Sequence, residues 1–177
     1  MAQITYQIDP AHSSAHFTVR HMMIANVRGE FTKVTGSFAF DRENPANSSI
    51  EAVIDVSSLH TNDADRDQHL KSPDFFDAGK FTEITFHGKS VTPQDGELVI
   101  RGDLTIHGVT REIALQVEGP TPEAKDPWGN IRVGATATGK INRKDFGLGW
   151  NVALEAGGVL VGEEVKISLD VQGMRKA

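Results

Sequence analysis

Apolar and polar residues alternate along most of the chain, and turn-forming residues stand where the alternation breaks. In residues 98–106 the even positions are apolar or Gly, whereas the odd positions include Arg101, Asp103 and Thr105. A period of two is typical of a β-strand with one buried face. His107-Gly108 follows with the length of a two-residue hairpin turn, and the alternation resumes in residues 109–118. These residues are therefore predicted to form an antiparallel hairpin.

The same pattern predicts eight or nine strands in sequence order. They lie at residues 4–8, 15–20, 27–40, 50–57, 82–91, 98–106, 109–118, 131–141 and 165–171. The long stretch 27–40 is expected to bend near Thr35-Gly36, because Phe31 and Phe38 fall on opposite parity. Sequential antiparallel strands of this number must either pack as two sheets or close into a barrel. The chain is predicted to be one all-β domain spanning residues 1–177.

One helical segment interrupts the strands, at about residues 62–71. Residues 62–65 offer an N-cap and an acidic first turn, and Pro73 prevents the helix from extending further. Its only apolar residues are Ala64 and Leu70. The helix is therefore expected to cover an opening or an edge of the sheet rather than to anchor the core.

Composition and charge exclude several classes of function. The 177 residues are 38% hydrophobic and 24% charged, which is typical of a soluble globular protein, and no apolar stretch is long enough to span a membrane. The 18 Lys and Arg against 24 Asp and Glu give a net charge of −6 without a basic stripe, which argues against nucleic-acid binding. There is no Cys. The N-terminal sequence lacks the features of a secretory signal, which predicts a cytoplasmic location.

His12, His16 and His21 are candidate metal ligands, because imidazole is the commonest protein ligand for transition metals. Their segment, however, alternates as a strand. Four residues of strand separate His12 from His16 by roughly 13 Å, and a single ion with bonds of about 2 Å does not bridge that distance. We predict no metal site here.

The helical segment also carries Asp65 and His69, which could pair one turn apart as a general base and its orienting carboxylate. On this alternative hypothesis the protein is an enzyme that acts on an apolar substrate through His69 and its acidic neighbours. The favoured interpretation is structural: Arg66 and Asp67 tie the helix to the barrel rim through hydrogen bonds. No catalytic residue is then predicted.

The predicted apolar faces contain many small residues, which leave space inside a closed sheet. These residues are Ala52, Gly88, Gly102, Ala135, Ala137 and Gly139. Alternating large and small residues can fit the taper of a small barrel, but an excess of small ones leaves volume unfilled. An eight-stranded barrel is wide enough to hold one slender ligand. An elongated apolar molecule is the expected guest.

An ordered set of short motifs resembles the YceI-like polyisoprenoid-binding family, from about Ile4 to Val171. The motifs are Ile8-Asp9-x-x-His12-Ser13, Phe17-x-Val19-Arg20-His21, Val27-Arg28-Gly29-x-Phe31, Gly36-x-Phe38-x-Phe40-Asp41, Ser58-Leu59-x-Thr61, Arg66-Asp67-x-His69-Leu70-x-Ser72-x-Asp74-Phe75, Gly102-x-Leu104-Thr105-Ile106-x-Gly108-Val109-Thr110, Asp126-Pro127-Trp128-Gly129 and Asn142-Arg143-Lys144-Asp145-Phe146-Gly147. No one of them is diagnostic, but their order is specific.

The resemblance implies an extended, eight-stranded antiparallel lipocalin-like barrel with one helix over its side. It also implies a hydrophobic pore that holds an isoprenoid chain, a homodimer, and no catalytic machinery or cofactor. The expected function is non-enzymatic binding and carriage or storage of an isoprenoid lipid. Relatives accept different isoprenoid lipids, including quinones, so the head group stays open.

Twelve residues are predicted to line the pore, most of them by strand parity. They are Phe17, Val19, Phe38, Phe40, Ile54, Ile84, Phe86, Leu104, Leu115, Ala135, Ala137 and Trp150. Four polar side chains are candidate contacts for the head group at the mouth of the pore: Arg20, His21, Arg66 and His69.

Overall fold

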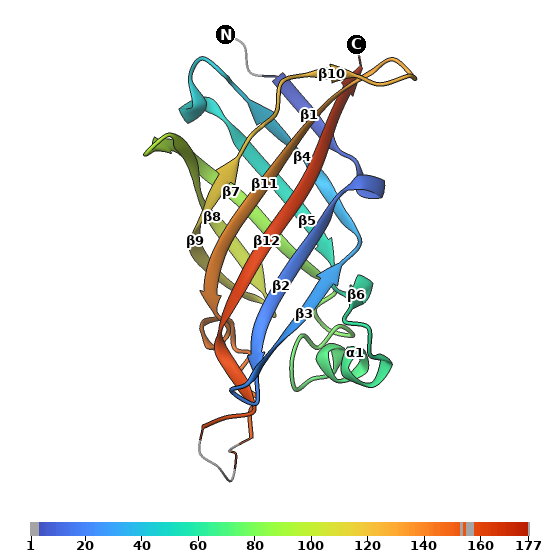
Figure 1. Ribbon diagram of the computed structural model, residues 1–177, viewed down its shortest axis with the longest axis vertical. Helices are drawn as coiled ribbons and strands as arrows, with labels where there is room; N and C mark the ends of the chain where they lie inside the picture. The colour runs from blue at the N-terminus through green and yellow to red at the C-terminus, as the bar shows by residue number, and fades with distance from the viewer. Residues whose placement is uncertain (1–3, 153, 155–157, 177) are drawn as a thin grey trace.

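The computed structural model describes residues 4–152, 154 and 158–176, which form one antiparallel sheet and a short α-helix (Figure 1). The strands are β1 (Ile4–Ile8), β2 (Ser14–His21), β3 (Ala25–Phe31), β4 (Val34–Phe40), β5 (Ser49–Asp55), β6 (Leu59–His60), β7 (Glu83–Gln94), β8 (Glu97–Ile106), β9 (Val109–Glu118), β10 (Ala124–Lys125), β11 (Asn130–Asn142) and β12 (Val161–Lys176). The helix is α1 (Ala64–Lys71).

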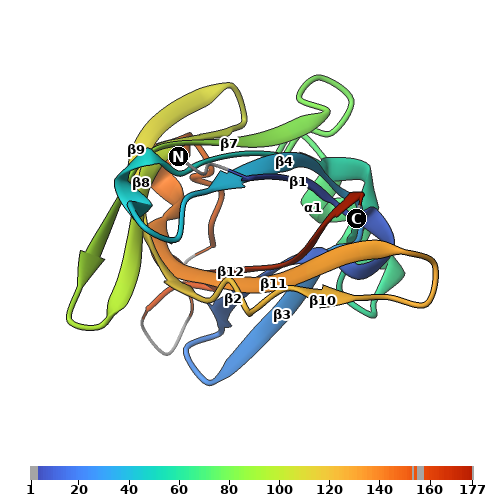
Figure 2. The same cartoon turned by 90° about the horizontal axis from the view of Figure 1, so that it is seen from above.

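The sheet closes on itself. Around the ring the neighbours are β1, β4, β5, β7, β8, β9, β11 and β12, and β12 pairs again with β1. These eight strands form a flattened ring when the molecule is viewed along its long axis (Figure 2). The predicted eight-stranded antiparallel barrel is therefore confirmed, and the two-sheet alternative is wrong.

At two positions in the barrel wall, two separate strands follow one another from the upper to the lower end: β1 above β2, and β4 above β3. β12 pairs with β1 through Gly173 and Met174, and with β2 from Val161 to Asp170. Likewise β4 pairs with β1, while β3 pairs with β2. As a result, β2 and β3 extend the wall beyond β1 and β4, towards the lower end in Figure 1.

The bend predicted near Thr35-Gly36 lies elsewhere. The break falls at residues 32–33, between β3 and β4, so that both Phe31 and Val34 are buried despite their opposite parity. Gly36 lies inside β4 with a φ of 132°, and a Cβ there would stand 2.0 Å from the carbonyl oxygen of Glu51. A glycine at this position therefore allows β5 to approach closely, and it does not mark a bend.

The hairpin between β8 and β9 matches the expectation from sequence. Ile106 is opposite Val109, and His107 and Gly108 have φ values of 55° and 73°. Two consecutive positive φ angles are those of a type I′ turn, whose twist suits a two-residue hairpin.

Helix α1 begins two residues later than predicted and ends at the predicted Lys71. Asn62 has a positive φ of 65°, and Asp63 is the N-cap, accepting hydrogen bonds from the amides of Asp65 and Arg66. Among the described residues, no helix has the length and apolar character that crossing a bilayer requires. The helix lies beside β6 and β3, at the lower end of the barrel (Figure 1).

Thr61 joins α1 to the end of β6. Arg66 donates from Nε to the Thr61 hydroxyl at 2.9 Å and from Nη2 to its carbonyl at 2.6 Å. Asp67 accepts from the Thr61 amide at 2.8 Å. The structural interpretation of Arg66 and Asp67 is confirmed by these bonds.

The upper end of the barrel is tightly packed on the side of β1. Tyr6 and Val133 are 1% and 2% exposed, and the Tyr6 and Phe38 rings stack with centroids 5.3 Å apart. A Cβ at Gly173 would lie 2.5 Å from the Phe38 ring, so the glycine makes room for that ring.

Three of the small residues do not leave space, contrary to expectation. A Cβ at Gly88, Gly102 or Gly139 would lie within 2.8 Å of a neighbour, because side chains such as Phe86 and Leu115 already occupy the volume above them. These glycines allow large neighbours to pack closely. Empty volume lies instead beside alanines.

Candidate ligand-binding cavity

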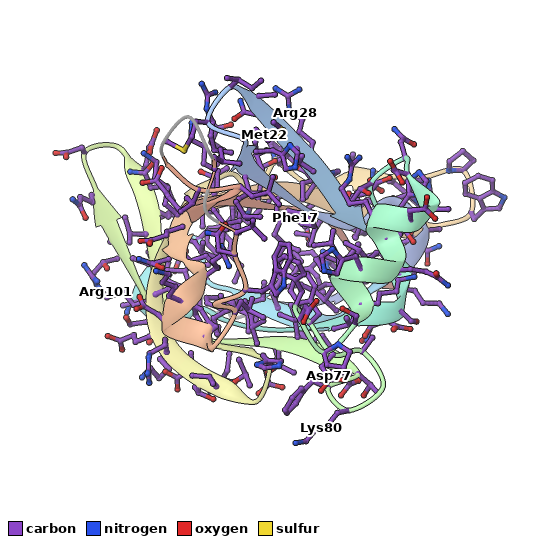
Figure 3. The ribbon with its side chains drawn as sticks, turned by 90° about the horizontal axis from the view of Figure 1, so that it is seen from below. Phe17, Met22, Arg28, Asp77, Lys80 and Arg101 are labelled. Atoms are coloured by element: carbon purple, nitrogen blue, oxygen red, sulfur yellow. The ribbon has the colours of Figure 1, made fainter. Side chains whose placement is uncertain are left out.

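A cavity of about 230 Å³ occupies the lower half of the barrel. Its wall is formed by the inward faces of β2, β3, β5, β7, β8, β9, β11 and β12. Helix α1 and the segments after α1 and after β11 line its lower end. In the view from below, Phe17 points towards the barrel interior and α1 runs along one side (Figure 3).

The wall of this cavity is predominantly apolar and aromatic beside the helix. Phe17, Phe31 and Phe76 form a cluster with ring centroids 5.6 to 6.5 Å apart. Phe17 covers Gly29 on the neighbouring strand, where a Cβ would lie 2.3 Å from its ring. Because Gly29 has no side chain, the Phe17 ring can lie directly against β3 at this position.

A second aromatic cluster places His69 at the lower edge of the cavity. Its imidazole centroid lies 5.1 Å from Phe75 and 4.7 Å from Trp150, edge to face in both pairs. His69 Nε2 lies 3.0 Å from Asp74 Oδ2. The alternative hypothesis paired His69 with Asp65, and that pairing is wrong: the chain turns back after α1, where the Phe76 amide donates to the Leu70 carbonyl, and brings Asp74 to the imidazole instead.

All the ionisable side chains that line the larger cavity within the described residues are basic. They are His16, Arg20, His21, Arg66, His69 and Arg143. The whole chain has a net charge of −6, so the residues that line the cavity differ in the sign of their charge from the molecule as a whole. Several of their polar atoms are already engaged within the protein: Arg66 donates to Thr61, Arg143 donates to backbone carbonyls, and His16 Nε2 lies 2.8 Å from the Ser14 hydroxyl. The cavity surface itself is almost wholly apolar.

Arg143 is a cavity residue that sequence reasoning missed. It is 3% exposed, and its guanidinium donates to the carbonyls of Gly162 at 2.7 Å, Trp150 at 3.0 Å, Val161 at 3.2 Å and Leu148. Burial lowers the pKa of Arg143 below its ordinary value. The side chain thereby holds the segment after β11 against the start of β12.

A smaller cavity of about 60 Å³ lies above the first, and Ala137 and Leu169 line both. Described residues thus line two adjoining apolar cavities, where one hydrophobic pore was predicted. Large side chains such as Phe38 and Phe86 occupy part of the interior that was predicted from strand parity to be empty.

The structure places all twelve predicted lining residues around one of the two cavities. Around the larger lie Phe17, Val19, Ile54, Ile84, Phe86, Leu104, Leu115, Ala137 and Trp150. Around the smaller lie Phe38, Phe40, Ala135 and again Ala137. The four head-group candidates Arg20, His21, Arg66 and His69 all border the larger cavity. Contact of any of them with a ligand stays a prediction.

Sequence reasoning also missed Phe31, Phe75, Phe76 and Leu148 in the lining. Phe31 was not among the predicted lining residues, and the break at residues 32–33 places its side chain in the interior. Phe75 and Phe76 come from a turn whose path no periodic pattern predicts. Their position directly after the helix and Pro73 was the only available signal.

The candidate metal ligands are engaged elsewhere. His12 Nδ1 lies 2.8 Å from Asp9 Oδ2, and His16 Nε2 lies 2.8 Å from the Ser14 hydroxyl. In the part of the chain that the structure describes, no three His, Asp or Glu side chains are grouped as metal ligands.

Comparison of the chain with solved structures places it among similar barrels. BcnA of Burkholderia cenocepacia superposes with a TM-score of 0.77 at 23% identity, covering 93% of this chain and 98% of that one. The Campylobacter jejuni YCEI protein gives a TM-score of 0.70 at 28% identity, covering 89% and 90%. A polyisoprenoid binding domain from Saccharophagus degradans gives 0.65 at 15% identity, covering 97% and 98%.

Sequence comparison agrees with the structural likeness. A UPF0312 protein of Vibrio parahaemolyticus is 41% identical over 144 residues, which are 80% of this chain and 76% of that protein. A UPF0312 protein of Photorhabdus laumondii is 35% identical over 173 residues, which are 97% and 86%. The family model described as a YceI-like domain matches residues 6–173. The chain therefore belongs to the YceI-like domain family.

Proposed function

We propose that the protein binds an isoprenoid lipid in the larger cavity and carries or stores it without chemical change. The observation that carries this proposal is a predominantly apolar cavity inside a closed barrel, bordered at its lower end by basic side chains. A polyisoprenoid binding domain has the same fold, and that ligand class suits an elongated apolar interior.

Apolar burial alone can supply the affinity. Each buried CH₂ group contributes about 0.8 kcal/mol, so a five-carbon prenyl unit contributes on the order of 3 to 4 kcal/mol. Three units therefore exceed the roughly 8 kcal/mol of a micromolar complex before the costs of ordering the ligand are subtracted. The part of a longer tail that exceeds the cavity protrudes into solvent or meets another surface.

The head group is proposed to lie among Arg20, His21, Arg66 and His69 at the lower end. Guanidinium and imidazole groups donate hydrogen bonds to oxygen acceptors, and the lining supplies no carboxylate within the described residues. An isoprenoid quinone, whose carbonyls accept such bonds, is one candidate.

Filling Ala137 tests the placement of the lipid, because this residue lines both cavities. We expect Ala137→Phe to lower the amount of lipid that co-purifies at least tenfold, since the ring occupies the volume of the tail. Native mass spectrometry and organic extraction measure the bound lipid.

Thr138→Phe is the matched control, because Thr138 is the exposed next residue of β11 and the same ring then faces solvent. Circular dichroism checks that both variants fold, and Ala137→Leu replaces Ala137→Phe if the larger ring is not accommodated. Unchanged lipid in a folded Ala137 variant contradicts the placement. A wild-type protein that neither carries nor takes up an isoprenoid contradicts the function.

One observation favours a second candidate, an enzyme acting on an apolar substrate. His69 borders the cavity with Asp74 at 3.0 Å, an arrangement in which a carboxylate can orient a general base. Under this hypothesis His69→Ala abolishes turnover without lowering ligand occupancy. The carrier proposal expects the lipid extracted from wild-type protein and from His69→Ala to be chemically the same.

Assembly and location belong to the same proposal. The homodimer implied by the family resemblance and the cytoplasmic location expected from the sequence are tested by light scattering and by cell fractionation.

A further inference from the structure

Four large apolar side chains stand exposed beside the lower end of the barrel. Met22, Met23 and Ile24 form the tip of the hairpin between β2 and β3 and are 44%, 51% and 76% exposed, and Val152 is 47% exposed. We call these four residues the apolar rim. Exposed apolar residues that gather in one place mark an interaction surface more often than scattered ones do.

The backbone of the hairpin tip is unusual for these residues. The Ile24 amide donates to the His21 carbonyl at 3.2 Å, and Met22 and Met23 have φ values of 52° and 63°. This is the geometry of a type I′ turn, in which Asn and Gly are strongly preferred and a long side chain is strained. The turn geometry therefore favours Asn and Gly at these two positions. Met23 does lie against Gly158, where a Cβ would stand 3.0 Å from its Cγ, but this contact leaves Met22 and Met23 44% and 51% exposed.

Hydrogen bonds connect the apolar rim directly to the wall of the larger cavity. The Met22 amide donates to the Leu160 carbonyl at 2.7 Å, and the Leu160 amide donates to the Val152 carbonyl at 2.9 Å. His21 and Leu160 both line the cavity. Figure 3 shows Met22 at the hairpin, beside the end of the barrel into which Phe17 points.

The charge beside the apolar rim is basic. Arg20 and Arg28 are exposed on the two strands of the hairpin, and neither has a carboxylate within ion-pair distance in residues 4–152, 154 and 158–176. On β12, Glu163 lies 2.7 Å from Lys144, and Glu164 lies 3.9 Å from Lys140. Apolar side chains flanked by guanidinium groups that have no carboxylate partner among the described residues fit the interface of an anionic bilayer.

We propose that the apolar rim inserts into the surface of an anionic phospholipid bilayer and brings the lower end of the cavity to the membrane. Met22, Met23, Ile24 and Val152 enter the boundary between head groups and acyl chains, while the exposed Arg28 contacts lipid phosphates. The relevance of this contact to lipid carriage rests on the proposed function. The docking itself is measured without any isoprenoid.

The test is co-sedimentation of the purified chain with phosphatidylcholine vesicles that contain phosphatidylglycerol. The double variant Met22→Asn, Met23→Gly installs the preferred turn sequence and removes two apolar side chains. We expect its binding to these vesicles to be weaker by about tenfold or more. Its melting temperature is expected to equal or exceed that of the wild type, because the turn is relieved of strain.

Trp128→Ser is the matched control. Trp128 is 79% exposed in the turn between β10 and β11, at the opposite end of the barrel, and its loss is expected to leave vesicle binding unchanged. Wild-type binding is expected to be weaker on pure phosphatidylcholine vesicles and at high salt, because the guanidinium contribution is electrostatic.

The proposal is overturned if the wild type does not bind the anionic vesicles, if the double variant binds them equally well, or if Trp128→Ser loses as much binding. Concentration-dependent self-association that the double variant abolishes also overturns it, because a second copy then covers the apolar rim. Vesicle binding that depends on the apolar rim supports docking even if the chain carries no isoprenoid. The absence of an isoprenoid contradicts only the proposed function.

Discussion

Arg143 illustrates how one side chain can order the segments that line one end of a cavity. A buried guanidinium is costly unless its donors are satisfied. Here the planar guanidinium donates to backbone carbonyls of Leu148, Trp150, Val161 and Gly162. It therefore holds the segment after β11 against the start of β12. Lys could not reproduce this arrangement, because an ammonium group has neither the fork nor the number of donors.

Asp9 is a buried carboxylate whose ionisation is expected to matter for acid stability. It is 7% exposed, and the Arg132 guanidinium at 2.7 Å and the His12 imidazole hold its pKa at about 2, against an ordinary 3.8. Because the folded state binds the proton less tightly, this contribution to the free energy of unfolding is complete above pH 3.8 and is lost as the pH falls towards 2.

We therefore expect the melting temperature of the wild type to fall across that pH range. Asp9→Asn is expected to be less stable at neutral pH, because Arg132 loses a partner, and to lose less stability on acidification. Asp95→Asn in the exposed turn between β7 and β8 serves as the control, with a pH profile like that of the wild type. Identical acid profiles for the wild type and Asp9→Asn would show that this prediction is wrong.

Among the elements, α1 contributes little apolar surface and is held mainly by polar contacts. It has no fully buried residue, and it is fixed by the Asp63 N-cap, by the bond that Arg66 donates to Thr61 and by the bond that Asp67 accepts from the Thr61 amide. Its contribution to the cavity lining, through Arg66, His69 and Leu70, depends on those contacts.

Removal of the N-cap is expected to loosen this side of the cavity without unfolding the barrel. Asp63→Ala should lower the free energy of unfolding by only about 1 kcal/mol. It should at the same time accelerate release of a bound lipid, because His69 and Leu70 move with the helix. Urea unfolding and the rate of lipid transfer to acceptor vesicles measure the two effects.

Asp65→Ala is the comparison for that prediction, since Asp65 lies in the same first turn but does not cap the helix. Equal lipid release from the wild type and Asp63→Ala contradicts the prediction that α1 helps to retain the bound lipid.

The elements were predicted well where a pattern repeated and poorly where it was interrupted. Alternation located β8, β9 and their turn, because the polarity of each residue in a half-buried strand indicates whether its side chain faces the core or the solvent. The break between β3 and β4 was misplaced by about three residues, because Gly36 resembled a bend signal and instead permits close strand approach. The start of α1 depended on the φ of Asn62, which no periodicity encodes.

At the scale of the whole molecule, strand parity was sufficient to choose residues that surround the interior. It was insufficient to measure the space that they leave. Gly88, Gly102 and Gly139 suggested empty volume, yet neighbouring side chains occupy it, and the space lies beside Ala137 instead. Packing depends on which side chains meet across the barrel, and those are far apart in the sequence.

By itself the sequence determined which residues form strands, which face of each strand is apolar, and that the chain resembles the YceI-like family. Those properties are local, because a strand and its buried face are set by residues one or two positions apart. Only the tertiary structure decided that the interior divides into two cavities, that Asp74 rather than Asp65 meets His69, and that Arg143 is buried at the lower end. Each of those depends on closure of the sheet, which brings distant segments into contact.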